Sequence, residues 1–190
     1  MADITKFPYC GHRHNCPCSQ GVQSYVPYYK QVLDLLQPRG VYEWGPGKNT
    51  QMALDMDCVQ NVVSVEQEKR WIPDIHYKRQ TVLYMQTGSE YYTKGYPGMF
   101  ESHLFDLFFV DSRRRAECID AVYEYTRGGP TLPRTHLPVP AVLCLHDAQR
   151  SRYHKALGRF EYVFFPHKGF AVATNHKQKF DLLKNGVRGE

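Results

Sequence analysis

The segment from Phe105 to Asp111 restricts the fold of this chain more than any other part of the sequence. It is an almost continuous apolar run that ends in a carboxylate, as expected for a parallel strand buried on both faces. Four other short apolar segments alternate with helical or irregular stretches: 41–44, 62–66, 81–85 and 141–145. Strands separated by crossovers predict an α/β fold with a mostly parallel sheet, helices on both faces and a ligand crevice at the carboxyl ends of the strands.

Helices are predicted on either side of these strands. Apolar residues recur at helical spacing after Ser24, which we expect to cap a helix that ends before Pro38, and again between Arg113 and Arg127. Strands at 162–165 and 170–174 predict a C-terminal antiparallel hairpin at the sheet edge, and the last fifteen residues add a frayed helix. The segment 129–140 is rich in proline and is expected to be a loop.

The length of 190 residues suits one domain with a proper hydrophobic core. We expect a Cys- and His-containing arm or lid over residues 1–23 and a single domain over residues 24–190. The start of the chain carries Asp3 and Lys6 and no long apolar run, and no stretch approaches the roughly 18 apolar residues of a membrane span. A cytoplasmic protein without a membrane partner, with free thiols at Cys58, Cys118 and Cys144, is therefore expected.

The segment Glu43-Trp44-Gly45-Pro46-Gly47 places two glycines directly after the first predicted strand. Without Cβ atoms, Gly45 and Gly47 allow a tight turn and the close approach of a ligand, and N–H groups at the next helix start can receive an anion. Glycine turns after strands are also common for geometric reasons alone. Thr50 stands where a dinucleotide-binding fingerprint has its third glycine, which disfavours a nicotinamide cofactor.

Glu66 ends the second predicted strand, nineteen positions after Gly47. A carboxylate at this place can accept hydrogen bonds from both ribose hydroxyls of an adenosine ligand, and Trp71 or Ile72 could cover the adenine. The alternative is a solvated carboxylate at a strand end, since Glu68 follows two residues later.

Two further strand ends carry polar side chains. Asp111 ends the fourth predicted strand, and His146 and Asp147 follow the fifth. Because these strands are neighbours in the expected sheet, the three side chains could converge on one substrate hydroxyl, with His146 as the base, or Asp111 and Asp147 could hold a divalent cation. A histidine that merely orders its loop and an aspartate that caps a helix are the alternatives.

Arginines follow both of these strand ends. The two that we expect to bind substrate are Arg115 and Arg150, since forked guanidinium donors suit a carboxylate or a phosphate. The formal net charge of +5 also favours an anionic partner. A solvated helix face would account for some of these charges. An anionic small molecule or glycan is therefore the expected acceptor, and nucleic acid is less favoured.

The order Gly-x-Gly, Val-Glu followed by a tryptophan, Phe-Val-Asp and His-Asp-x-x-Arg resembles class I S-adenosylmethionine-dependent methyltransferases, and more closely the plant polysaccharide enzymes that O-methylate glucuronic acid. The resemblance spans about residues 40 to 175 and implies a Rossmann-like fold and O-methylation of a sugar or acidic small molecule. The expected contacts of S-adenosylmethionine are Glu43, Gly45, Gly47, Thr50, Glu66 and Asp111, with Glu43 facing the cationic end of its methionine moiety. The chain departs from that family at Glu43 and at Ser112-Arg113.

The N-terminal arm gathers several soft metal ligands: Cys10, His12, Cys16 and Cys18. Zinc is one candidate for them, although the tight Cys-x-Cys spacing does not match the separated ligand pairs of standard structural sites. A lid over the cofactor pocket and a packed arm with incidental cysteines are the alternatives.

Two other functions remain open at this point. Methylation of RNA or DNA is suggested by the net charge, the aromatic residues and the Cys/His arm, but the chain lacks an Asn/Asp-Pro-Pro-Tyr-type motif. A non-catalytic module that binds a nucleoside in the same crevice is the second alternative.

Overall fold

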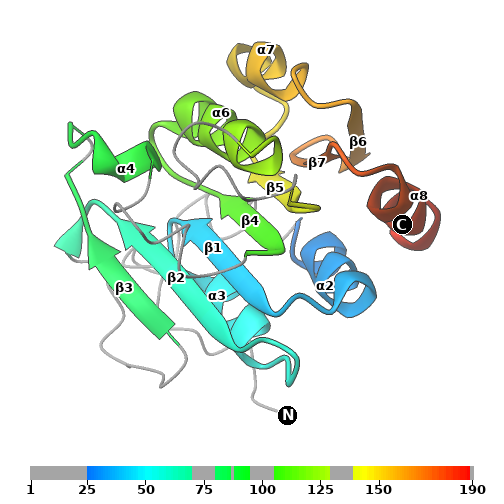
Figure 1. The fold of residues 1–190 in the computed structure, drawn as a ribbon, viewed down its shortest axis with the longest axis horizontal. Coiled ribbons are helices and arrows are strands. Elements are labelled where there is room, and N and C mark those ends of the chain that lie inside the picture. Colours follow the sequence, from blue (N-terminus) through cyan, green and yellow to red (C-terminus); the bar gives the residue numbers. More distant parts are fainter. Residues whose placement is uncertain (1–24, 70–79, 87, 95–104, 129–138, 189–190) are drawn as a thin grey trace, which may run out of the picture.

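The computed structural model describes residues 25–69, 80–86, 88–94, 105–128 and 139–188. Its centre is one seven-stranded sheet in the order β3-β2-β1-β4-β5-β7-β6 (Figure 1). The first five strands pair in parallel, whereas β7 is antiparallel to both β5 and β6. The predicted mostly parallel sheet with a C-terminal antiparallel hairpin at its edge is confirmed. The strands are β1 (Gly40–Trp44), β2 (Asn61–Glu66), β3 (Gln80–Tyr84), β4 (Leu107–Val110), β5 (Val142–His146), β6 (Tyr162–His167) and β7 (Phe170–Thr174).

Helices cover both faces of the sheet, with α6 on one face and α2 and α3 on the other (Figure 1). Residues Lys177–Gly186, within the last fifteen residues that were expected to form a frayed helix, form a regular helix that packs on α2 and on the hairpin. The helices are α2 (Val26–Leu36), α3 (Lys48–Leu54), α4 (Tyr91–Lys94), α6 (Arg115–Thr126), α7 (His154–Leu157) and α8 (Lys177–Gly186), with a short 3-10 turn, η3 (Ser151–Tyr153).

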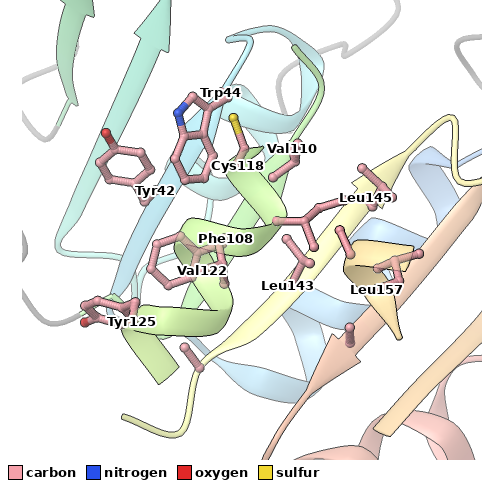
Figure 2. Packing of buried hydrophobic residues seen from close by; sticks show 14 of the residues in the cluster. Tyr42, Trp44, Phe108, Val110, Cys118, Val122, Tyr125, Leu143, Leu145 and Leu157 are labelled. Atoms are coloured by element: carbon pink, nitrogen blue, oxygen red, sulfur yellow. The ribbon is translucent and has the colours of Figure 1, made fainter. Parts of the chain in front are cut away.

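The apolar run of β4 supplies both halves of the core because successive strand side chains point to opposite faces. Phe108 and Val110 pack with α6 and α7 in one cluster, part of which is shown in Figure 2, with Trp44 at one side of it. Leu107 and Phe109 pack with α2, α3 and α8 in the other. All four side chains are 0% exposed. The continuous apolar run of β4 therefore forms a strand that is buried on both faces, as predicted.

The strand register brings the polar strand ends to one edge of the sheet. Trp44 of β1 is paired with Val110 of β4, which in turn is paired with Leu145 of β5. The next residues are Asp111, directly after β4, and His146, the last residue of β5, so the two residues lie at the same level of the sheet. The backbone N–H of Asp111 also donates to the carbonyl of Trp44 over 2.8 Å, which fixes the glycine turn against the end of β4.

Several expectations fall outside the described residues: the arm over residues 1–23, the Ser24 cap, Trp71 and Ile72, and most of the proline-rich loop. Cys58, Cys118 and Cys144 are free, as expected. Among the described helices, none is long and apolar enough to cross a membrane. The short elements α4, η3 and α7 had no counterpart in the sequence prediction, since segments of three or four residues carry too little periodicity to be recognised.

Candidate active site

The glycine turn needs a glycine at its first position. Gly45 has a φ of +91°, and a Cβ atom added to it would lie 2.3 Å from the carbonyl oxygen of Asp111. Gly47 differs, because its φ of 177° is extended backbone and its added Cβ would meet only the Asn49 side chain, at 3.3 Å. The requirement at Gly45 is thus imposed by the protein itself, through the close approach of the turn to the end of β4.

Glu43 is buried beneath the glycine turn and forms hydrogen bonds with residues of α3 and β2. Its carboxylate is 0% exposed and accepts hydrogen bonds of 2.5 Å from Asn49 Nδ2, Thr50 Oγ1 and Ser64 Oγ. These donors come from α3 and β2, so one side chain joins three elements. Thr50 Oγ1 also accepts from the Gly47 N–H over 2.8 Å, so that N–H is already partnered. The polar groups of Glu43 and Thr50 organise the turn, and their predicted contact with a cofactor stays a prediction.

Burial raises the pKa of Glu43 to about 7, against the lowering effect of its three hydrogen-bond donors. Because the folded pKa lies above the unfolded value near 4.5, the native state binds the extra proton between these two values and loses stability as the pH rises through this window.

Glu43→Gln removes this charge, so the stability of the variant relative to the wild type is expected to increase by about 2 kcal/mol between about pH 5 and about pH 8. Urea unfolding of both proteins at these two pH values measures the difference, and the comparison cancels other titrating groups. The same difference in free energy of unfolding between the two proteins at both pH values would contradict the assignment of Glu43 as a buried titrating group.

Glu66 lies at the carboxyl end of β2, as predicted, and is 5% exposed. Its Oε1 accepts from the backbone N–H groups of Gln67 and Glu68 over 2.7 and 2.9 Å. Burial raises the pKa of Glu66, and these two donors only partly oppose the effect. The loop is held further by an ion pair of 3.1 Å between Glu68 and Arg113. Glu66 is therefore a fixed carboxylate rather than a freely solvated one.

The predicted cluster of Asp111, His146 and Asp147 is brought together. His146 Nδ1 lies 3.1 Å from Asp111 Oδ2, and His146 Nε2 lies 3.9 Å from Asp147 Oδ1. The approach of Nδ1 to Asp111 is at ion-pair distance, but its direction is not that of a well-formed hydrogen bond. Burial would raise the pKa of Asp111, yet His146 and Arg115 outweigh it and hold that pKa below the ordinary value.

The two arginines predicted to bind substrate belong to the same cluster, but they differ in how many of their guanidinium donors already contact the protein. The Arg115 side chain is 11% exposed, and its guanidinium contacts Asp111 Oδ1, the Ser112 carbonyl and Asp147 Oδ2, the last at 3.4 Å. Arg150 contacts Asp147 Oδ2 at 2.7 Å while 47% of its side chain is exposed. Arg150 thus has guanidinium surface open to solvent, whereas Arg115 mainly holds the two aspartates in place.

Asp147 occupies an uncommon backbone conformation. Its φ is +62°, in the left-handed region, and its carbonyl accepts from the Arg150 N–H over 3.2 Å. The chain therefore turns sharply directly after β5, and no described helix begins at Asp147, since η3 starts at Ser151. The alternative of a helix-capping Asp147 does not apply.

The described residues do not form a recognisable metal site. Among residues 25–69, 80–86, 88–94, 105–128 and 139–188, no group of three or more Cys, His, Asp or Glu side chains is arranged to hold one. Asp111 and Asp147 already face guanidinium groups. The candidate zinc ligands Cys10, His12, Cys16 and Cys18 lie outside the described residues.

Aromatic side chains complete the cluster, and sequence reasoning did not identify them. The ring of Tyr25 lies 4.6 Å from the ring of His146, centroid to centroid. The Arg115 guanidinium lies 5.9 Å from the ring of Tyr153. In the sequence Tyr25 is one of several apolar residues at helical spacing in the predicted helix. No sequence pattern connects it with His146, which lies 121 positions later.

Neither a protein-family model nor the sequence of a curated protein matches this chain. Solved structures match its fold. A methyltransferase-like protein from Silicibacter pomeroyi has 15% identity and a TM-score of 0.51 over 93% of this chain and 97% of its own. A candidate O-methyltransferase from Klebsiella pneumoniae has 14% identity and a TM-score of 0.56 over 86% and 82%. A spermidine synthase from Thermotoga maritima has 15% identity and a TM-score of 0.52 over 84% and 61%.

At these identities the likeness establishes the fold alone, a Rossmann-like fold shared with these solved methyltransferase structures, as predicted. The spermidine synthase shares that fold although it carries a different name and extends well beyond the matched part. The reaction must therefore be argued from the site.

Proposed function

We propose that the chain is an S-adenosylmethionine-dependent methyltransferase that acts on a hydroxyl group. The observation that carries the proposal is the contact between Gly45 and the carbonyl of Asp111, which sets a ligand-accessible glycine turn directly beside a cluster of a base and two aspartates. Glu66, one strand further along the same sheet edge, is a fixed carboxylate of the kind that binds ribose hydroxyls. The proposed ribose acceptor on β2, the cofactor turn after β1 and the proposed base on β5 thus lie in this order along one edge of the sheet.

The residues present fit this cofactor. At Gly47 the turn has no Cβ to obstruct an approaching ligand, since an added Cβ there would meet only the Asn49 side chain, and Glu66 can receive hydroxyl donors at Oε2, because its backbone donors contact Oε1. When bound, S-adenosylmethionine supplies a methyl group already activated by its sulfonium charge. The protein then has to position the acceptor oxygen in line and remove its proton.

His146 is the residue that we assign to proton removal. If Nδ1 carries the proton and faces Asp111 Oδ2, Nε2 is free to accept the proton of an acceptor hydroxyl. The Asp111 carboxylate then stabilises the imidazolium that forms. The Nδ1–Asp111 geometry is looser than a hydrogen bond, which is common for catalytic pairs before the ligands bind. Asp147 contacts the guanidinium groups of both Arg115 and Arg150.

The acceptor that suits this site is anionic. Arg150 is half-exposed, lies beside His146 through Asp147 and can bind a carboxylate with its remaining donors. A uronic acid has a carboxylate and several hydroxyls on one small ring, and it is also the acceptor that the resemblance to plant polysaccharide methyltransferases implies. Glucuronic acid and caffeic acid, a phenolic acid, are therefore the first acceptors to test.

The test is the release of S-adenosylhomocysteine from S-adenosylmethionine in the presence of each acceptor, followed by mass spectrometry of the methylated product. The proposal expects turnover that depends on the acceptor. A protein that binds the cofactor yet methylates neither these acids nor neutral sugars and phenols would favour the non-catalytic nucleoside-binding module, a role compatible with the internal pairing of both aspartates.

Arg150→Gln is expected to raise the KM for glucuronic acid by about tenfold or more, with little change in kcat, because a charged hydrogen bond contributes roughly 1.5–3 kcal/mol. Glucose serves as the matched substrate, since it lacks the carboxylate, and its KM should be unchanged by the substitution. Equal KM changes for the charged and the neutral sugar would argue against Arg150 as the anion-binding residue.

A further inference from the structure

The His146 ring has two carboxylates within reach, and its tautomer depends on which of them takes the proton. Nδ1 is 3.1 Å from Asp111 Oδ2, and Nε2 is 3.9 Å from Asp147 Oδ1. A neutral imidazole has one N–H, and the nitrogen that donates to a carboxylate leaves the other nitrogen basic. Donation to Asp111 makes Nε2 the base, whereas donation to Asp147 would disable it.

Tyr25 is packed against this ring. It lies at the start of α2, is 2% exposed, and its ring centroid is 4.6 Å from that of His146, with the planes inclined by 45°. The tyrosine is itself wedged between other rings, at 5.4 Å from Phe109 and 6.0 Å from Phe170. Since protein interiors are close-packed, a rotation of the imidazole would have to push Tyr25 into these neighbours.

The strand pairing holds the other end of His146. It is the last residue of β5 and is paired with Phe170 of β7, the residue that also contacts Tyr25. The left-handed backbone of Asp147 then turns the chain away. The imidazole is thus fixed by its own strand, by its neighbour on β7 and by a ring from α2, which leaves Asp111 as the nearer partner.

We propose that Tyr25 is a positioning residue that selects the tautomer of His146, keeping Nδ1–H directed at Asp111 so that Nε2 remains the basic nitrogen. The inference rests on the proposed function, in which Nε2 takes the acceptor proton. Its physical basis is the ring contact.

The same helix provides a matched control. Tyr28, three residues further along α2, is 8% exposed and lies 6.5 Å from Phe170, so it shares the packing of Tyr25. Its histidine neighbour is His167, at 5.6 Å, instead of His146. A substitution at Tyr28 therefore removes a comparable ring from α2 without touching the cluster.

Nitrogen-15 NMR of histidine-labelled, full-length protein at about pH 8.5, where a model imidazole is neutral, reports the tautomer directly and needs no methyl acceptor. In the wild type and in Tyr25→Phe we expect a roughly tenfold excess of the Nδ1–H form of His146. Tyr25→Met should reduce it to roughly equal amounts of the two forms, because both carboxylates can then compete. Tyr28→Met should leave the His146 signals unchanged.

A wild type in which the Nε2–H form dominates would overturn the proposal without reference to any variant. So would an unchanged tautomer in Tyr25→Met, or an equal change in Tyr28→Met, which would point to a general loosening of α2. In turnover assays, Tyr25→Met should lower kcat by the factor by which the Nδ1–H form falls, with KM unchanged. If His146→Gln retains full turnover, the proposed function of His146 fails, whereas the NMR outcome decides the role of Tyr25 separately.

Discussion

Gly45→Ala is expected to weaken the binding of S-adenosylmethionine by roughly 30-fold or more and to destabilise the fold by at least about 2 kcal/mol. The residue has a φ of +91°, where an L side chain is strained, and the added Cβ would overlap the Asp111 carbonyl oxygen at 2.3 Å. The turn can relieve this overlap only by moving away from β4. Because the cofactor contacts require the turn in its original place, binding has to restore the strain that this movement relieved, and about 2 kcal/mol corresponds to roughly 30-fold in affinity.

Gly47→Ala is the matched control for this prediction. It lies two residues away in the same turn, but its backbone is extended and its added Cβ would meet only a side-chain oxygen at 3.3 Å. Urea unfolding and calorimetric titration of both variants separate the two cases. Similar behaviour of the two alanine variants would show that the contact with Asp111 does not shape the cofactor site.

His146→Gln is expected to lower kcat by about 100- to 10,000-fold, the usual contribution of a general base. Glutamine keeps a polar group of similar reach beside Asp111, and Arg115 continues to neutralise that carboxylate. The affinity for S-adenosylmethionine should therefore remain within about threefold of the wild type. S-adenosylhomocysteine release with the acceptor that the wild type uses, together with cofactor titration, measures both quantities.

His167→Gln is the control for this substitution. His167 is a second histidine near the same strands, but its Nδ1 already accepts from the Gly169 N–H over 3.1 Å and its ring stacks on Tyr28. Its replacement should change kcat by less than about threefold. A retained kcat in His146→Gln, or a comparable loss in both variants, would remove His146 from the role of base.

The sheet could be predicted from sequence because its central strands carry their own signal. The run from Leu107 to Val110 is apolar at every position, and this pattern has few solutions other than a strand covered on both faces. The end of that strand then locates Asp111. In the same way, the end of β5 locates His146 and Asp147, so the convergence of these side chains follows from the parallel arrangement of the sheet alone.

The internal partners of the site were beyond sequence reasoning because they depend on side-chain contacts between distant elements. Ser64, on β2, completes the hydrogen bonding of Glu43, and Tyr25 covers His146 from another helix. Neither Ser64 nor Tyr25 belongs to a sequence motif with a characteristic spacing. Arg115 and Arg150 differ in how many of their guanidinium donors contact the protein, and this difference likewise depends on the turn after β5. That turn places Asp147 in the left-handed region, which a sequence without glycine at this position does not indicate.

The proposed binding of S-adenosylmethionine beside Gly45 is the basis of every role that we assign to this site. Isothermal titration calorimetry of the full-length, reduced protein with S-adenosylmethionine tests it most directly, with thermal unfolding of the same sample to establish that the chain is folded. We expect saturable binding at one site per chain, weakened strongly in Gly45→Ala and little changed in Gly47→Ala and His146→Gln. A folded wild-type protein that binds neither S-adenosylmethionine nor S-adenosylhomocysteine would contradict it.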